Sequence, residues 1–165
     1  MKMKSSMLGL IVIVVIFGSV GITSALELWK TTNDKVPVRY TAGISAGQYN
    51  PADIRGSYTF GEIQKVFEIP VEDLGIAFGV KDPGNYDSFR CKELETIYAP
   101  LAAQGKEVGT GSVRYFVALY KGLPITLVDG TYLPKPAVDI LKAKASLTQE
   151  QLQFINKHMV DIPKD

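Results

Sequence analysis

The feature that most constrains this chain is an uncharged run close to its N-terminus. Met7 to Leu26 contains 20 residues without a charged side chain, and the first charge after Lys4 is Glu27. An α-helix rises about 1.5 Å per residue, so such a run spans about 30 Å, the thickness of the hydrocarbon core of a bilayer. The run therefore predicts an N-terminal transmembrane helix that contacts membrane lipid through residues 7–28.

The charges that flank the run predict its orientation. Lys2 and Lys4 precede it, and Glu27 follows it. The positive-inside rule then places the N-terminus in the cytoplasm and the domain outside, with Trp29 at the level of the lipid headgroups. A cleaved secretory signal is also compatible with the basic start, the apolar stretch and the small residues at 23–25. The first alternative gives a single-pass membrane protein, and the second gives a secreted one.

The part of the chain that follows the run is neutral by formal count. The chain has 18 Lys and Arg residues, two of them before the run, and 17 Asp and Glu residues, one of them Glu27; 16 of each sign remain in residues 30–165. Binding to nucleic acid through bulk electrostatics needs an excess of positive charge. We therefore expect no nucleic-acid partner.

One cysteine and one histidine restrict the possible chemistry. Cys91 has no partner for an internal disulfide, and together with His158 it provides too few ligands for a zinc or iron–sulfur site. Cys91 shares a helical stripe with Leu94 and Ile97, which predicts a buried thiol; pairing with a second chain or attachment of a cofactor is the alternative. His158 is expected on the surface near the end of a helix. We assign no catalytic, cofactor-binding or metal-binding residue and expect no cofactor and no enzymatic activity.

Composition divides the chain into three parts. Residues 1–29 form the anchor or signal segment. Residues 30–57 contain few large aliphatic residues and many small polar ones, which is typical of a spacer. Residues 58–165 carry capping residues followed by apolar residues at helical spacing. This pattern predicts a mainly α domain of five or six short helices with one β-hairpin.

Capping boxes mark two of the predicted helices. Thr59 and Glu62 precede a helix that ends before Pro70, and Thr148 and Gln151 begin the last helix. In a capping box the hydroxyl accepts from a backbone N–H three residues on, and the third side chain reaches back. Further helices are expected at about 71–78, 88–101, 113–120 and 137–145.

The run from Ile125 to Leu133 carries the predicted hairpin. Asp129 and Gly130 suit a type I′ turn between two flanks of high β-propensity. A helix in each half ends in an aliphatic residue followed by proline, at Pro70 and Pro124. This similarity hints at two related halves, residues 58–105 and 108–160.

Some of the eight tyrosines fall in predicted loops and flanks of the helices. Aromatic residues in such places suit a protein interface, and packing into the core is the alternative for each of them. The candidate partner-binding residues are Tyr40, Tyr49, Tyr58 and Tyr132.

Two stretches carry a resemblance to a known module: Asp53-Ile-Arg-Gly-Ser-Tyr-Thr-Phe-Gly-Glu-Ile63 and Phe67-Glu-Ile-Pro-Val-Glu-Asp-Leu74. Over residues 50–80 the chain resembles a short helical module of uncharacterised membrane proteins of anaerobic bacteria and archaea. The module also occurs as an extension of membrane-bound ferredoxin-like (4Fe-4S) proteins. The resemblance implies a membrane setting and a redox complex as a neighbour. The ferredoxin cysteines are absent here, so any cluster would belong to a partner.

These features predict an extracytoplasmic binding or assembly module that docks on another membrane protein. The alternative is a small-ligand-binding protein or an enzyme with a pocket between the two halves. Such a pocket would be apolar with a few convergent polar groups. Candidates for those groups are Arg90, Arg114 and Tyr98.

Overall fold

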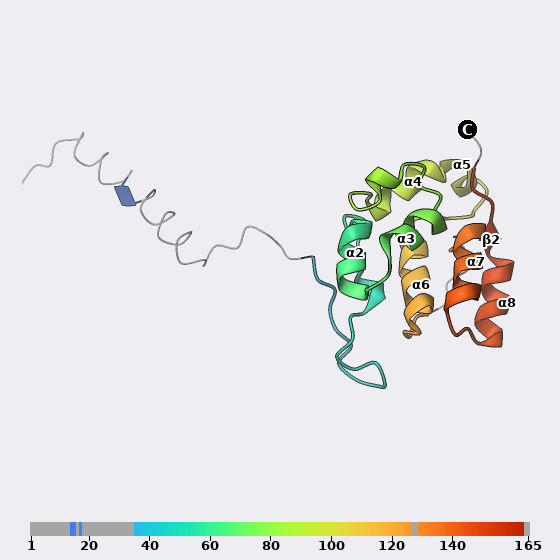
Figure 1. Ribbon diagram of the computed structural model, residues 1–165, viewed down its shortest axis with the longest axis horizontal. Coiled ribbons are helices and arrows are strands. Elements are labelled where there is room, and N and C mark those ends of the chain that lie inside the picture. Colours follow the sequence, from blue (N-terminus) through green and yellow to red (C-terminus); the bar gives the residue numbers. More distant parts are fainter. Residues whose placement is uncertain (1–13, 16, 18–34, 127–128, 164–165) are drawn as a thin grey trace, which may run out of the picture. The chain divides into compact units, whose positions relative to one another are not determined.

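The computed structural model describes residues 14, 15, 17, 35–126 and 129–163. Val14, Val15 and Phe17 are helical and exposed. The rest of the predicted membrane helix, residues 7–28, lies outside the described residues. Within the described ranges, no helix combines the length and apolar character needed to cross a bilayer. Residues 35–165 form one compact unit, shown with labelled elements in Figure 1.

The compact unit is mainly helical, as predicted, with seven α-helices among its described residues. Three short 3₁₀ helices accompany them: η1 precedes α2, and η2 and η3 lie between α3 and α4. The α-helices are α2 (Phe60–Phe67), α3 (Val71–Ala77), α4 (Leu94–Ile97), α5 (Ala99–Ala102), α6 (Thr110–Lys121), α7 (Lys135–Lys144) and α8 (Gln149–Lys157). The 3₁₀ helices are η1 (Pro51–Asp53), η2 (Pro83–Asn85) and η3 (Cys91–Glu93).

Both predicted capping boxes are present. At the start of α2, Glu62 N donates to Thr59 Oγ1 at 3.1 Å, and Thr59 N donates to Glu62 Oε2 at 2.7 Å. Thr148 and Gln151 make the same pair of bonds at the start of α8, at 3.2 and 2.9 Å. Each box satisfies two backbone groups that a helix end otherwise leaves unpaired.

The single helix expected at 88–101 is instead three short pieces, η3, α4 and α5. Pro100 explains the last break, because proline has no N–H for the helix ladder and is tolerated only in a first turn. It stands in the first turn of α5. The predicted apolar stripe still faces inward, since Cys91, Leu94 and Tyr98 are at most 1% exposed.

The predicted hairpin at 125–133 is not formed by the described residues. The turn at Gly130 is present, with a φ of 100°, but the segment after it pairs with distant parts of the chain. Strand β1 (Leu133–Pro134) pairs in parallel with β2 (Met159–Val160). Tyr132 N also donates to Glu107 O at 2.8 Å. Local β-propensity cannot specify such long-range partners.

Helix α6 lies between α2 and the pair α7 and α8 in the view of Figure 1, and α3 packs directly on α7. Its residues from Tyr115 to Leu119 are at most 3% exposed. Phe116 packs edge-on against Phe78, with ring centroids 5.6 Å apart, and Phe78 lies 5.9 Å from Phe60. This aromatic cluster therefore joins α2 and the end of α3 to α6.

A polar network joins three helices around Asp73 of α3, which is 8% exposed. Lys144 of α7 places its Nζ 2.7 and 2.8 Å from the two carboxylate oxygens. Tyr120 of α6 donates its hydroxyl to the same carboxylate at 2.7 Å. Burial and this hydrogen bond raise the pKa of Tyr120 to about 12, so the hydroxyl remains a donor at neutral pH.

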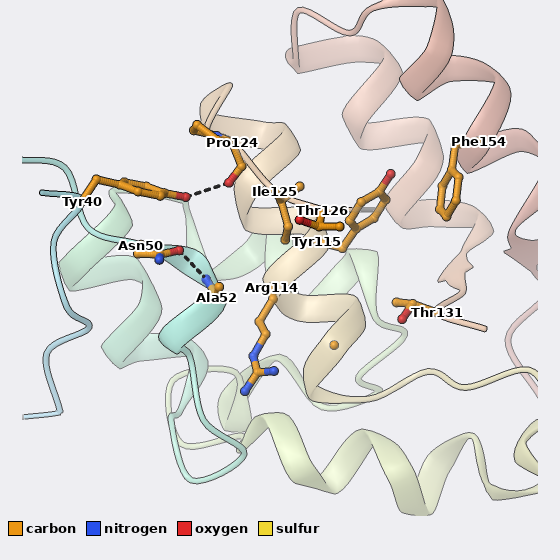
Figure 2. A pocket seen from close by; sticks show the side chains of 11 residues that line it. Tyr40, Asn50, Ala52, Arg114, Tyr115, Pro124, Ile125, Thr126, Thr131 and Phe154 are labelled. Atoms are coloured by element: carbon orange, nitrogen blue, oxygen red, sulfur yellow. Dashed lines mark hydrogen bonds between the residues drawn. The ribbon is translucent and has the colours of Figure 1, made fainter. Parts of the chain in front are cut away.

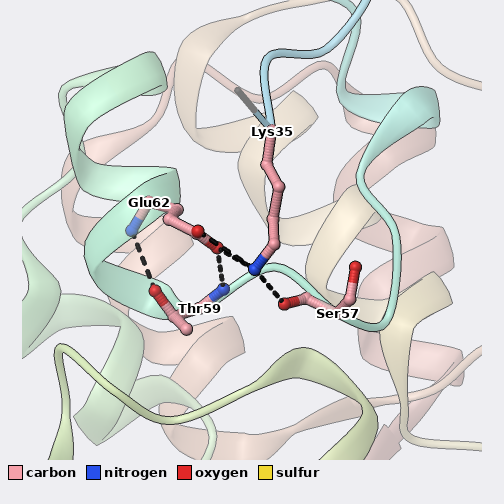
Figure 3. A network of polar contacts seen from close by, with 4 residues as sticks. All are labelled: Lys35, Ser57, Thr59 and Glu62. Carbon is pink, nitrogen blue, oxygen red and sulfur yellow. Dashed lines mark hydrogen bonds and ion pairs between the residues drawn. The ribbon is translucent and has the colours of Figure 1, made fainter. Parts of the chain in front are cut away.

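The compact unit begins before residue 58, where the sequence suggested that the helical domain starts. Lys35 Nζ lies 3.0 Å from Glu62 Oε1 and donates to Ser57 O at 2.9 Å, as Figure 3 shows. Ile54 is completely buried. Parts of residues 35–57, which belong to the predicted spacer, therefore contact the helices, although most side chains of residues 35–48 are exposed.

Replacing Asp73 by Asn should lower the free energy of unfolding by about 1–3 kcal/mol, because Lys144 loses its charged partner. Because Lys144 is half-exposed, water can solvate its ammonium group in the variant and limits the loss of stability. Urea denaturation of the full chain followed by circular dichroism measures the change. Glu72→Gln, at the exposed neighbouring position, is the control and should have no effect. Equal stability of the two variants would contradict a stabilising role for the network.

Candidate binding site

Residues 35–50, here called the arm, form an irregular loop whose two ends pair with each other. Tyr40 N donates to Gln48 O at 2.9 Å, and Asn50 N donates to Val38 O at 2.8 Å. Arg39 lies over the ring of Tyr49, with its guanidinium carbon 3.8 Å from the ring centroid, and also donates to Gly47 O. The arm therefore has a defined conformation although it contains no regular strand.

The four candidate tyrosines occupy different environments. Tyr40 is half-buried and donates its hydroxyl to Pro124 O at 2.7 Å. Tyr49 is half-buried against Phe67, with ring centroids 6.4 Å apart. Tyr58 is 4% exposed and belongs to the core. Tyr132 is half-buried beside His158, at 5.2 Å between ring centroids. The structure brings Tyr40 and Tyr49 together in the arm and places Tyr132 elsewhere.

A cleft of about 630 Å³ lies between the arm and α6. Its base is formed by Gly111, Arg114 and Tyr115 of α6. The walls come from the arm and η1 on one side, and from the segment after α6 together with α8 on the other. The wall residues are Tyr40, Asn50, Ala52, Pro124, Ile125, Thr126, Thr131 and Phe154.

Arg114 is the only charged residue among the described residues that line the cleft. Its Nε donates to Ile54 O at 2.7 Å, which fixes the plane of the guanidinium. Figure 2 shows Arg114 and Tyr115 leaving α6 in different directions. The cleft consequently has a charged end at Arg114 and an aromatic end at Tyr115 and Phe154, whose ring centroids are 5.5 Å apart.

The hydroxyl of Tyr115 is buried and has no hydrogen-bond partner among the described residues. Most buried hydroxyls are paired, so an unpaired one is unusual. Burial, with a smaller contribution from the charge of Glu150, raises the pKa of Tyr115. The hydroxyl is therefore protonated at neutral pH.

Of the three residues considered for a pocket between the two halves, only Arg114 lines this cleft. Arg90 is exposed, and Tyr98 is buried with its hydroxyl donating to Phe78 O at 3.0 Å. Tyr115 and Phe154 were not anticipated, because their side chains come from helices far apart in the sequence. A usable signal for Arg114 is that it is the only charge between Glu107 and Lys121.

His158 was expected on the surface, but it is 5% exposed. Its ring stacks on Phe154 at 3.9 Å between centroids, and Nδ1 lies 3.0 Å from Phe154 O. Nε2 lies 3.4 Å from a carboxylate oxygen of Asp129. The expectation failed because β2 follows α8 directly and turns the histidine inward against the segment around Tyr132.

Cys91 is buried, as its helical spacing predicted. Burial raises the pKa of this thiol to about 12, which leaves almost no thiolate at neutral pH. Within the described ranges, no three His, Cys, Asp or Glu side chains are grouped closely enough to hold a metal ion.

Iodoacetamide should fail to label Cys91 in the native protein at pH 8 and should label it fully in urea. The reaction needs an accessible thiolate, and the folded protein supplies neither access nor ionisation. Mass spectrometry of protein quenched at successive times gives the extent of labelling. Rapid labelling without urea would show that Cys91 is accessible and reactive in the native protein.

Replacing Tyr115 by Phe should leave the free energy of unfolding unchanged or raise it by up to about 1 kcal/mol, because a buried unpaired hydroxyl is removed. The matched control is Tyr98→Phe, which removes the hydrogen bond to Phe78 O and should lower the free energy of unfolding by about 1 kcal/mol. Thermal unfolding of the three proteins provides the comparison. If both variants lost stability equally, the Tyr115 hydroxyl would have a partner in solution.

Comparison of the chain with protein families, with curated proteins and with solved structures finds no match in any of the three.

Proposed function

We propose that this chain is a non-catalytic binding and assembly module that uses the arm to dock on another membrane protein. Residues 7–28 hold it in the membrane, with the N-terminus in the cytoplasm and the helical unit outside. The observation that carries the proposal is the exposure of large apolar side chains on an arm that is itself well fixed.

Apolar exposure is concentrated in the arm. Val36, Val38 and Ile44 are 48%, 63% and 106% exposed, three large aliphatic residues within one short segment. In the helices and strands of the compact unit, the large hydrophobic residues exposed to a similar degree are Ile76 and Met159. Single exposed apolar residues are common, but a group of them suits an interaction surface.

The arm is held by contacts near both ends. Lys35 pairs with Glu62 and Tyr40 donates to Pro124 O near the first end, and Tyr49 packs on Phe67 near the second. A surface that already has its bound conformation loses less entropy when it meets a partner. These contacts give Tyr40 and Tyr49 a supporting role, in which they position the apolar residues of the arm.

The choice of a membrane partner rests on the sequence. The uncharged run predicts an anchor, and residues 50–80 resemble a module found beside membrane-bound ferredoxin-like proteins. We propose an accessory role in a membrane redox complex, in which any iron–sulfur cluster belongs to the partner. A cleaved N-terminal segment would leave the same docking surface on a secreted protein.

Ile44→Asp should weaken recovery of the partner by at least tenfold, because a buried charge in an apolar interface is costly. The measurement is crosslinking followed by co-purification of the full chain from native membranes, with quantitative mass spectrometry. Ile76→Asp places the same charge at an exposed position of α3 and should leave recovery unchanged. Recovery of the monomer alone with the native sequence, or equal recovery with both variants, would contradict the proposal.

A further inference from the structure

We infer that the cleft between the arm and α6 binds a small organic anion, with its carboxylate at Arg114 and its apolar body against Tyr115 and Phe154. This inference goes beyond docking on a protein and does not depend on it. The apolar residues of the arm point to a macromolecule, whereas the cleft is a concave site with its own charge.

The charge of the cleft selects an anion. Arg114 is the single charged residue among the described lining residues, and only its Nε is used by the protein, in the bond to Ile54 O at 2.7 Å. The two terminal nitrogens have no partner in the described part of the chain. A guanidinium fixed through Nε can present these nitrogens side by side, the arrangement that binds a carboxylate through two hydrogen bonds.

The rest of the cleft selects an apolar body. Tyr115 and Phe154 form its aromatic end, and Tyr40, Pro124 and Ile125 add apolar surface. Three uncharged polar side chains, Asn50, Thr126 and Thr131, complete the lining. A mainly apolar cleft of about 630 Å³ with few polar groups has the size and character of a small-molecule site.

The cleft is held open by bonds that cross it or support its base. Tyr40 donates its hydroxyl to Pro124 O at 2.7 Å, as drawn in Figure 2, and so links the arm to the segment after α6. The hydrogen bond from Arg114 Nε to Ile54 O links α6 to the residue that follows η1. A site that exists before the ligand arrives loses little binding energy to reorganisation.

Gly111 provides a way to fill the cleft without touching Arg114. A Cβ atom at this position would meet only Thr131, at 3.6 and 3.8 Å, which is ordinary van der Waals contact. Gly111 lies in the first turn of α6, where leucine favours the helix more than glycine does. Gly111→Leu should therefore fold, with its side chain in the space that the ligand would use.

The test is isothermal titration calorimetry of the full chain in phosphatidylcholine nanodiscs, with empty nanodiscs as the blank. The probe is indole-3-butyrate, a bicyclic aromatic carboxylate, and its neutral amide is the matched ligand. The acid should bind with a Kd below about 1 mM, typical for a ligand of that size, and the amide at least tenfold more weakly. Gly111→Leu and Arg114→Gln should each weaken binding of the acid at least tenfold.

The control variant is Arg90→Gln, which removes one exposed positive charge outside the cleft and should leave the Kd unchanged. Equal affinity for the acid and the amide would overturn the inference, because the cleft would then not select charge. Unchanged binding in Gly111→Leu would also overturn it, and so would the absence of saturable binding to the native protein.

Discussion

The structure depends on the burial of helix α6. Its buried residues pack against η1 and α7, and Phe116 contacts Phe78 at the end of α3. Both ends are tied. Ser112 donates its hydroxyl to Tyr132 O at 2.7 Å, and Gly122, with a φ of 64°, closes the last turn in the left-handed region.

The candidate sites follow from how α6 is covered. Helices enclose most of its surface, and the first turns remain open at Gly111 and Arg114, where the arm and η1 approach. The same approach fixes the arm, because Tyr40 reaches the segment directly after α6. The arm therefore forms one wall of the cleft and also carries the exposed residues Val38 and Ile44. A ligand in the cleft and a partner on the arm would share one wall.

The sequence predicts what is encoded locally. Thr59 with Glu62 and Thr148 with Gln151 lie three residues apart, and both capping boxes are present as expected. Contacts between distant residues were beyond sequence reasoning: Tyr40 bonds to a carbonyl 84 residues away, and Arg114 to one 60 residues away. The parallel pairing of β1 with β2 has the same long-range origin, and a favourable turn sequence could not reveal it. Composition predicted a spacer at 30–57 because this segment has few large aliphatic residues. The backbone hydrogen bonds from Tyr40 N to Gln48 O and from Asn50 N to Val38 O give part of it a defined conformation, and such bonds leave no pattern in the sequence.

Native-state hydrogen exchange of the full chain tests the central role of α6 most directly. We expect the amides of Phe116 to Leu119 to exchange only through global unfolding and to be the slowest in the chain. Their free energy of exchange should equal the free energy of unfolding measured with urea. If these amides exchanged through a local opening, while those of α8 remained protected, α6 would not be the element on which the fold is built.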